Sequence, residues 1–189
     1  MMKVTPENKL DRISFPGKIY LINSNQELSA VAENLKNIQE FGFDTETRPS
    51  FKKGEVYKVA LLQLATADTA FLFRLHRLTE FQLLKSIFEN PKVLKVGAAL
   101  RDDLRQLQIT FKFSPKNFVE LQDLAKTKGL KNFGLKGMTE EILQATISKG
   151  PKMTNWEASE LSPPQQLYAA TDAWIGLELY KKLQSKTAD

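Results

Sequence analysis

Two acidic residues stand where a buried strand is expected. Phe41 and Phe43 alternate with Asp44 and Glu46, the side-chain pattern of a strand. The two-residue period puts both carboxylates on one face, roughly 7 Å apart at the backbone. Burying two neighbouring acids costs several kcal/mol each unless a cation lies between them. They are therefore either exposed at a strand end, with one paired to Arg48, or ligands of a cation.

A third acid lies on an apolar helical stripe near the C-terminus. At 100° per residue, Tyr168, Asp172, Ile175 and Leu179 fall within about 60° of one another, and Asp172 carries the only charge. Such an acid either pairs with a lysine, caps a loop or performs chemistry. Tyr168, one turn earlier, is either a packed core aromatic or a hydroxyl that orients a water.

A fourth candidate comes from a pair of adjacent acids. Leu100, Leu104 and Leu107 define the apolar face of a short helix. Asp103 lies about 65° from the centre of that face and Asp102 about 170° from it, toward solvent. Two acids near a helix start also suit the helix dipole. We take Asp103 as the candidate and Asp102 as its solvated neighbour.

Together, Asp44, Glu46, Asp103 and Asp172 predict a site for a hard metal. Carboxylates without cysteine, and with His76 as the single histidine of the chain, favour Mg²⁺ or Mn²⁺ over Zn²⁺. Four carboxylates can hold two ions about 3.5–4 Å apart, the arrangement used for phosphodiester cleavage. Such ions supply a hydroxide and stabilise the leaving 3′ oxygen, so no covalent nucleophile is required.

Composition bounds the class of protein. The chain has 189 residues, no cysteine, and 27 Lys+Arg against 22 Asp+Glu, a net charge of +5. Disulfides, thiolate metal sites and cysteine nucleophiles are excluded. No membrane-length apolar run or signal peptide is visible, so we expect a soluble cytoplasmic protein, or a nuclear one in a eukaryote. The basic excess is compatible with a phosphate-rich partner.

The expected elements form one α/β domain. Apolar alternation predicts strands over 18–22, 40–47, 57–66, 69–75 and 93–98. Capping residues and helical periodicity predict helices over 24–38, 79–89, 100–108, 121–128, 135–147 and 162–185. This order predicts a mixed β-sheet flanked by α-helices. We expect an N-terminal extension over 1–17, the domain over 18–185 and a tail over 186–189.

Three segments resemble the signature motifs of the DEDD superfamily of 3′–5′ exonucleases, also called DnaQ-like. They are FDTET at 43–47, VGAALRDDL at 96–104 and YAATDA at 168–173, the last in the tyrosine form (DEDDy). The segment 59–65 and Asn155-Trp156 also resemble the subgroup of ribonuclease D (RNase D) and the Werner syndrome helicase exonuclease domain. The resemblance spans about residues 18–183.

The resemblance implies an RNase H-like fold and two-metal removal of nucleotides from a 3′ end. It assigns Asp44, Glu46, Asp103 and Asp172 as catalytic metal ligands. Tyr168 is then the catalytic residue that orients the attacking water.

Departures from the family pattern bear on the substrate. The alternative form of the superfamily has a histidine at the position of Leu167, and His76 is remote and expected in a surface turn, so only the tyrosine mechanism is available. RNase D relatives carry His-Asn where this chain has Ala98-Ala99. We therefore expect DNA as substrate. An RNA 3′–5′ exonuclease and a non-catalytic nucleic-acid-binding module remain open alternatives, and a protein partner could supply specificity.

Lysines interleaved with aromatics lie between the second and third motifs. They suit a single-stranded or frayed 3′ end through phosphate contact and base stacking, or else form a solvated basic loop around a core tryptophan. The lysines are Lys126, Lys128, Lys131, Lys136, Lys149 and Lys152, with Phe133, Met153 and Trp156 among them. This pattern makes Lys149, Lys152 and Trp156 candidate substrate contacts. The resemblance to the family implies that Thr45, Thr47 and Leu62 contact the terminal nucleotide.

Overall fold

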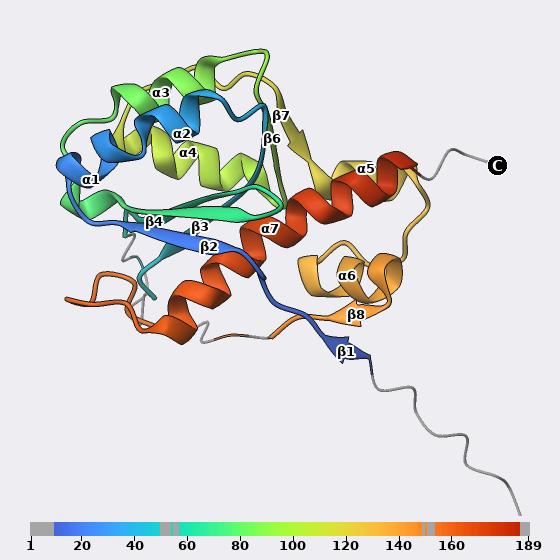
Figure 1. The fold of residues 1–189 in the computed structure, drawn as a ribbon. Helices are drawn as coiled ribbons and strands as arrows, with labels where there is room; N and C mark the ends of the chain where they lie inside the picture. Colours follow the sequence, from blue (N-terminus) through green and yellow to red (C-terminus); the bar gives the residue numbers. More distant parts are fainter. Residues whose placement is uncertain (1–9, 50–53, 55–56, 149, 151–153, 186–189) are drawn as a thin grey trace, which may run out of the picture.

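The protein is built on one mixed sheet, seen in a computed structural model that describes residues 10–49, 54, 57–148, 150 and 154–185 (Figure 1). The strand order is β2-β5-β4-β3-β6-β7. β3, β4 and β5 form an antiparallel meander, while β2 joins β5, β6 joins β3 and β7 joins β6 in parallel. The strands are β2 (Lys18–Ile22), β3 (Glu40–Thr47), β4 (Val59–Ala65), β5 (Thr69–Arg74), β6 (Leu94–Gly97) and β7 (Phe118–Glu120).

Helices cover both faces of this sheet, as the sequence predicts (Figure 1). One face packs against α1 (Asn25–Ala30), α2 (Ala32–Lys36), α3 (Gln82–Glu89) and α4 (Leu100–Thr110). The long α7 (Pro163–Ser185) crosses the other face, and α5 (Leu121–Thr127) and α6 (Leu135–Leu143) pack beside it. A 3₁₀ turn, Leu75–Arg77, follows β5 and carries an exposed His76, as expected.

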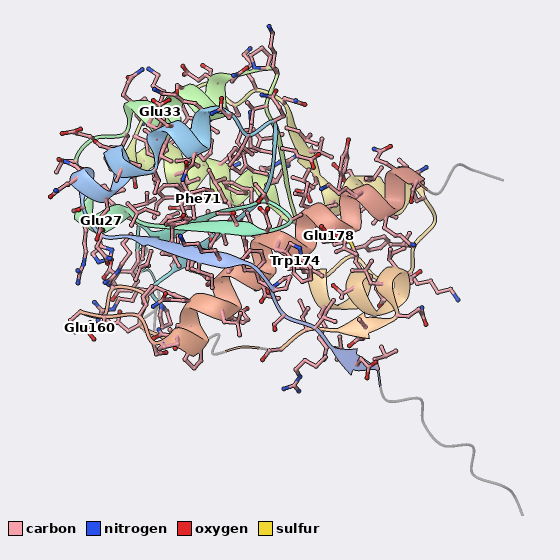
Figure 2. All side chains as sticks on the ribbon, in the orientation of Figure 1. Glu27, Glu33, Phe71, Glu160, Trp174 and Glu178 are labelled. Atoms are coloured by element: carbon pink, nitrogen blue, oxygen red, sulfur yellow. The ribbon has the colours of Figure 1, made fainter. Side chains whose placement is uncertain are left out.

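Each face of the sheet has its own core. Phe43 and Leu64 point toward α3 and α4, whereas Leu61 packs with the small residues of α7. The segment leading into β2 also joins the α7 side, where the ring centroids of Phe15 and Trp174 lie 6.0 Å apart in an edge-to-face contact. Figure 2 shows Trp174 on α7. Apolar side chains thus cover both sheet faces, so a charged group buried against either face is costly unless it is paired or binds an ion.

Several predicted boundaries were wrong. The helix predicted over 24–38 divides at Val31, and Phe81 rather than Thr79 precedes α3, because the Thr79 hydroxyl accepts a hydrogen bond from Asn25. The helix predicted over 135–147 ends at Leu143, where Gln144 turns left-handed (φ 52°). After it, β8 (Ala145–Thr146) pairs in parallel with β1 (Asp11–Arg12).

The short strands β7, β1 and β8 were not predicted, since two or three residues carry too little periodicity. Among the described helices, none is both long and apolar enough to cross a membrane.

Candidate active site

The end of β3 presents the first two acids. β6 pairs with β3 only over residues 40–42, so Asp44 and Glu46 lie beyond the last paired residue on that side. Both side chains are half-buried and point to the face covered by α7. Their expected alternative partner, Arg48, instead pairs with Glu157 at 3.8 Å.

A glycine brings the third acid to the same place. A Cβ on Gly42 would lie 1.8 Å from the carbonyl oxygen of Ala173, so only glycine lets α7 approach β3 this closely. This close approach brings Asp172, which is 9% exposed, next to the acids of β3. Carboxylate oxygens of Asp44, Glu46 and Asp172 all lie within 4.8 Å of one another.

The fourth acid reaches the cluster from the opposite helix layer. α4 begins three residues after β6 ends, and its first turn carries Asp103, which is half-buried and hydrogen-bonded to the Thr45 side chain. Asp102 is exposed and pairs with Arg105 at 3.6 Å. The predicted orientation of the two neighbours is confirmed.

Burial and neighbouring charges raise the pKa values of Asp44, Glu46 and Asp103. Burial, followed by the charges of Asp172, Glu46 and Asp103, holds the pKa of Asp44 well above its usual range. Burial and the charges of Asp172 and Asp103 raise the pKa of Glu46 to about 8. Burial raises the pKa of Asp103 to about 6, although its bond to Thr45 opposes the shift. A divalent cation would offset both causes, so the donor set fits a hard metal ion.

Tyr168 is fixed on three sides. Its hydroxyl is hydrogen-bonded to Asp172, and its ring stacks on Trp156 with centroids 6.2 Å apart and 28° between the planes. Gly150, at φ 52°, lies so close to the ring that a Cβ there would be 1.9 Å from it. Burial, and then the charge of Asp172, raises the pKa of the Tyr168 hydroxyl, which keeps its proton at neutral pH.

A cavity of about 340 Å³ opens beside this tyrosine. Leu167, Tyr168 and Asp172 form one side of it, and the segment 12–14 forms another. Its volume lies within the range of small-ligand sites. Asp172 therefore borders an accessible space and is not sealed in the core.

Of the candidate substrate contacts, some lie beside the acids and others are buried in the core. Thr45 and Thr47 lie on β3 beside the acids, and Thr47 is exposed. Leu62 and Trp156 are 0% and 1% exposed, which corrects the expectation that they present surfaces to substrate. Leu62 is in the middle of a strand covered on both faces, and the indole of Trp156 packs under α7.

The basic segment is only partly described. Lys149 and Lys152 lie outside the described residues. Lys126 pairs with Asp123 at 3.2 Å, and Lys136 pairs with Glu140 at 3.5 Å. Both lysines are exposed enough to exchange these partners for phosphates.

The glycines that let neighbouring segments pack closely around the site were not predicted from the sequence. Gly42 and Gly150 are the clearest cases. A glycine inside a strand of apolar residues signals a close backbone approach, so Gly42 could have been found. The contact of Gly150 with Tyr168 joins segments far apart in the chain and has no local signal.

The fold and the acid cluster together define a class, the 3′–5′ exonucleases with the RNase D fold. The solved structure of Escherichia coli RNase D matches with a TM-score of 0.80 and 26% identity, covering 88% of this chain and 44% of that one. The chain belongs to the 3′–5′ exonuclease family, whose model matches residues 19–188.

Two relatives illustrate the breadth of this family. The chain is 33% identical to the bifunctional 3′–5′ exonuclease/ATP-dependent helicase WRN of Mus musculus, over 97% of this chain and 14% of the relative. It is 30% identical to ribonuclease D of Haemophilus influenzae, over 92% of this chain and 43% of the relative. The chain thus spans less than half the length of either relative.

Proposed function

We propose that this chain is a two-metal 3′–5′ exonuclease that hydrolyses phosphodiester bonds at the 3′ end of nucleic acid, with DNA as its main substrate. The observation that carries the proposal is the convergence of Asp44, Glu46 and Asp172 within 4.8 Å, with Asp103 beside them. A donor set made only of carboxylate oxygens suits Mg²⁺ or Mn²⁺. Two such ions, when bound, supply an activated water and neutralise charge on the leaving oxygen.

The protein's own residues then divide the work. The four acids hold the ions, and their negative charge is what makes the site selective for divalent cations. The Tyr168 hydroxyl is fixed by Asp172 and by the ring of Trp156, and it orients the attacking water through a hydrogen bond. Thr45 holds Asp103 in place, and the exposed Thr47 is a contact for the terminal nucleotide.

RNA is the second candidate substrate, and the similarity to ribonuclease D of Haemophilus influenzae favours it. Both readings use the same acids, because recognition of a 2′-hydroxyl depends on the substrate pocket and not on the metal site. A purely binding role is disfavoured, since crowding four acids in a half-buried cluster is costly without a cation.

A time course with 5′-labelled oligonucleotides tests this proposal. DNA and RNA strands are incubated in parallel with Mg²⁺, Mn²⁺ or EDTA and resolved on a denaturing gel. The expected result is a ladder that shortens from the 3′ end, is absent in EDTA and grows faster with DNA. Intact label in every lane, together with binding in EDTA that weakens steeply with salt, would instead establish a binding module.

A further inference from the structure

Glu120, the last residue of β7, holds the start of α4. Its Oε2 accepts a hydrogen bond from the backbone N–H of Leu100 at 2.7 Å, and its Oε1 accepts one from that of Ala99 at 3.0 Å. The same Oε1 also accepts from the N–H of Gln122, at the start of α5, at 3.0 Å. One carboxylate therefore ties the end of β7 to the beginnings of two helices.

α4 needs this external support because its own sequence provides none. Ala99 occupies the N-cap position in a left-handed conformation (φ 60°, ψ 36°) and offers no side-chain hydrogen bond. Alanine disfavours that conformation, and an alanine cap leaves the first N–H groups of a helix without acceptors. The negative charge of Glu120 also suits the positive end of the helix dipole.

The first turn of α4 carries Asp103, the one acid of the four that lies outside the close trio. Asp103 is not part of the trio whose oxygens lie within 4.8 Å, and it comes from the opposite layer of the fold. Its position relative to Asp44 and Glu46 therefore depends on where α4 starts. Thr45 restrains the side chain of Asp103, and Glu120 restrains the backbone from which it projects.

We propose that Glu120 is a positioning residue for Asp103, which fixes the start of α4 where Asp103 can complete the second of the two cation sites. This inference rests on the proposed function. A carboxylate suits this role, since its two acceptor oxygens serve Ala99 and Leu100 together, whereas an amide offers one.

The test measures Mn²⁺ binding and thermal stability side by side. Wild type, Glu120→Ala, Glu120→Gln and Asp103→Asn are titrated with Mn²⁺ in a calorimeter, and their melting temperatures are taken in EDTA. Asp123→Ala is the matched control, because Asp123 is an exposed acid three residues along the chain that pairs with Lys126. Wild type is expected to show two classes of Mn²⁺ site, one of which Asp103→Asn abolishes.

We expect Glu120→Ala to weaken that same class about tenfold and to leave the other unchanged, as supporting contacts of metal ligands do. Glu120→Gln, which keeps one acceptor, should lose less, and Asp123→Ala should lose nothing. If Glu120→Ala does not fold, Glu120→Gln decides the question. A lower melting temperature with both Mn²⁺ affinities intact would reduce Glu120 to a structural cap and overturn the inference alone. Absence of Mn²⁺ binding by wild type would instead overturn the proposed function.

Discussion

The individual carboxylates of the site are held in a state that costs free energy unless a cation is present. Burial and the neighbouring charges raise the pKa values of Asp44, Glu46 and Asp103 together. Burial is the largest cause of each shift and nearby like charges add to it, so the protein places these acids together rather than pairing each with a base. Function and stability therefore make opposite demands on these residues.

Replacing Asp172 by asparagine separates the two demands. Asparagine keeps the shape but removes one of the three carboxyl groups whose oxygens lie within 4.8 Å of one another. In EDTA, we expect the melting temperature of Asp172→Asn to exceed that of wild type by a few degrees, because repulsion is relieved. Exonuclease rates in Mg²⁺ should fall about 1,000-fold, equivalent to ~4 kcal/mol in the barrier. A destabilised variant with normal activity would show that Asp172 is structural.

The Tyr168 hydroxyl can be removed without disturbing its packing. Phenylalanine in Tyr168→Phe retains the stack on Trp156, so the melting temperature should change little. Single-turnover rates are expected to fall about 100-fold, since the water loses its orienting group. Mn²⁺ affinity, measured by calorimetry, should persist because the four acids remain. An unchanged rate would remove Tyr168 from the mechanism.

At the scale of elements, the site exists because α7 lies unusually close to β3. Gly42→Ala would place a Cβ 1.8 Å from the Ala173 carbonyl, so helix and strand must separate. We expect a loss of about 3 kcal/mol in the free energy of unfolding, measured with urea, since overpacking against backbone cannot relax. Mn²⁺ affinity should fall as well, because Asp172 moves with α7. A variant as stable as wild type would contradict this description of the contact.

The two adjacent acids of α4 are expected to differ in their importance for activity. Asp103 faces the cluster and bonds to Thr45, whereas Asp102 faces solvent beside Arg105. Asp103→Asn should lower the exonuclease rate at least 100-fold, while Asp102→Asn should stay within about twofold, as surface changes do. The reverse order of effects would mean that the second motif is assigned to the wrong residue.

The sequence predicts those features that arise within one segment and not those that depend on contacts between distant segments. Strand and helix periods correctly place Asp44 and Glu46 on one face, and Asp103 rather than Asp102 toward the core. The burial of Trp156 and the cap supplied by Glu120 arise from contacts between distant segments. Periodicity within one segment carries no information about them, so the longer elements were predictable and the distances between elements were not.

For the whole molecule, the acid cluster sets how stability depends on pH. The folded state raises the pKa of Glu46 to about 8 and that of Asp103 to about 6, whereas carboxyl groups of the unfolded chain have pKa values of about 4. Between these values the folded chain binds more protons than the unfolded chain, so its stability falls as pH rises. Lys95, whose pKa burial lowers to about 8, gives the opposite slope, but only above that pH.

We therefore expect the melting temperature in EDTA to decline from about pH 5 to pH 8, above which Lys95 opposes any further decline. Saturating Mg²⁺ should reverse the decline, because ions bind the ionised acids of the folded state. Circular dichroism melts across this range, with and without Mg²⁺, measure both effects. A melting temperature that rises toward pH 8 in EDTA would contradict the pKa shifts of the cluster.

The most direct test of the account is to locate the ions themselves. Crystals grown with Mn²⁺ and measured at the manganese absorption edge should show two anomalous peaks about 3.5–4 Å apart. We predict one peak among Asp44, Glu46 and Asp172, and the other on the side of Asp103. Manganese bound elsewhere, with the four acids empty at saturating concentration, would contradict the two-metal exonuclease.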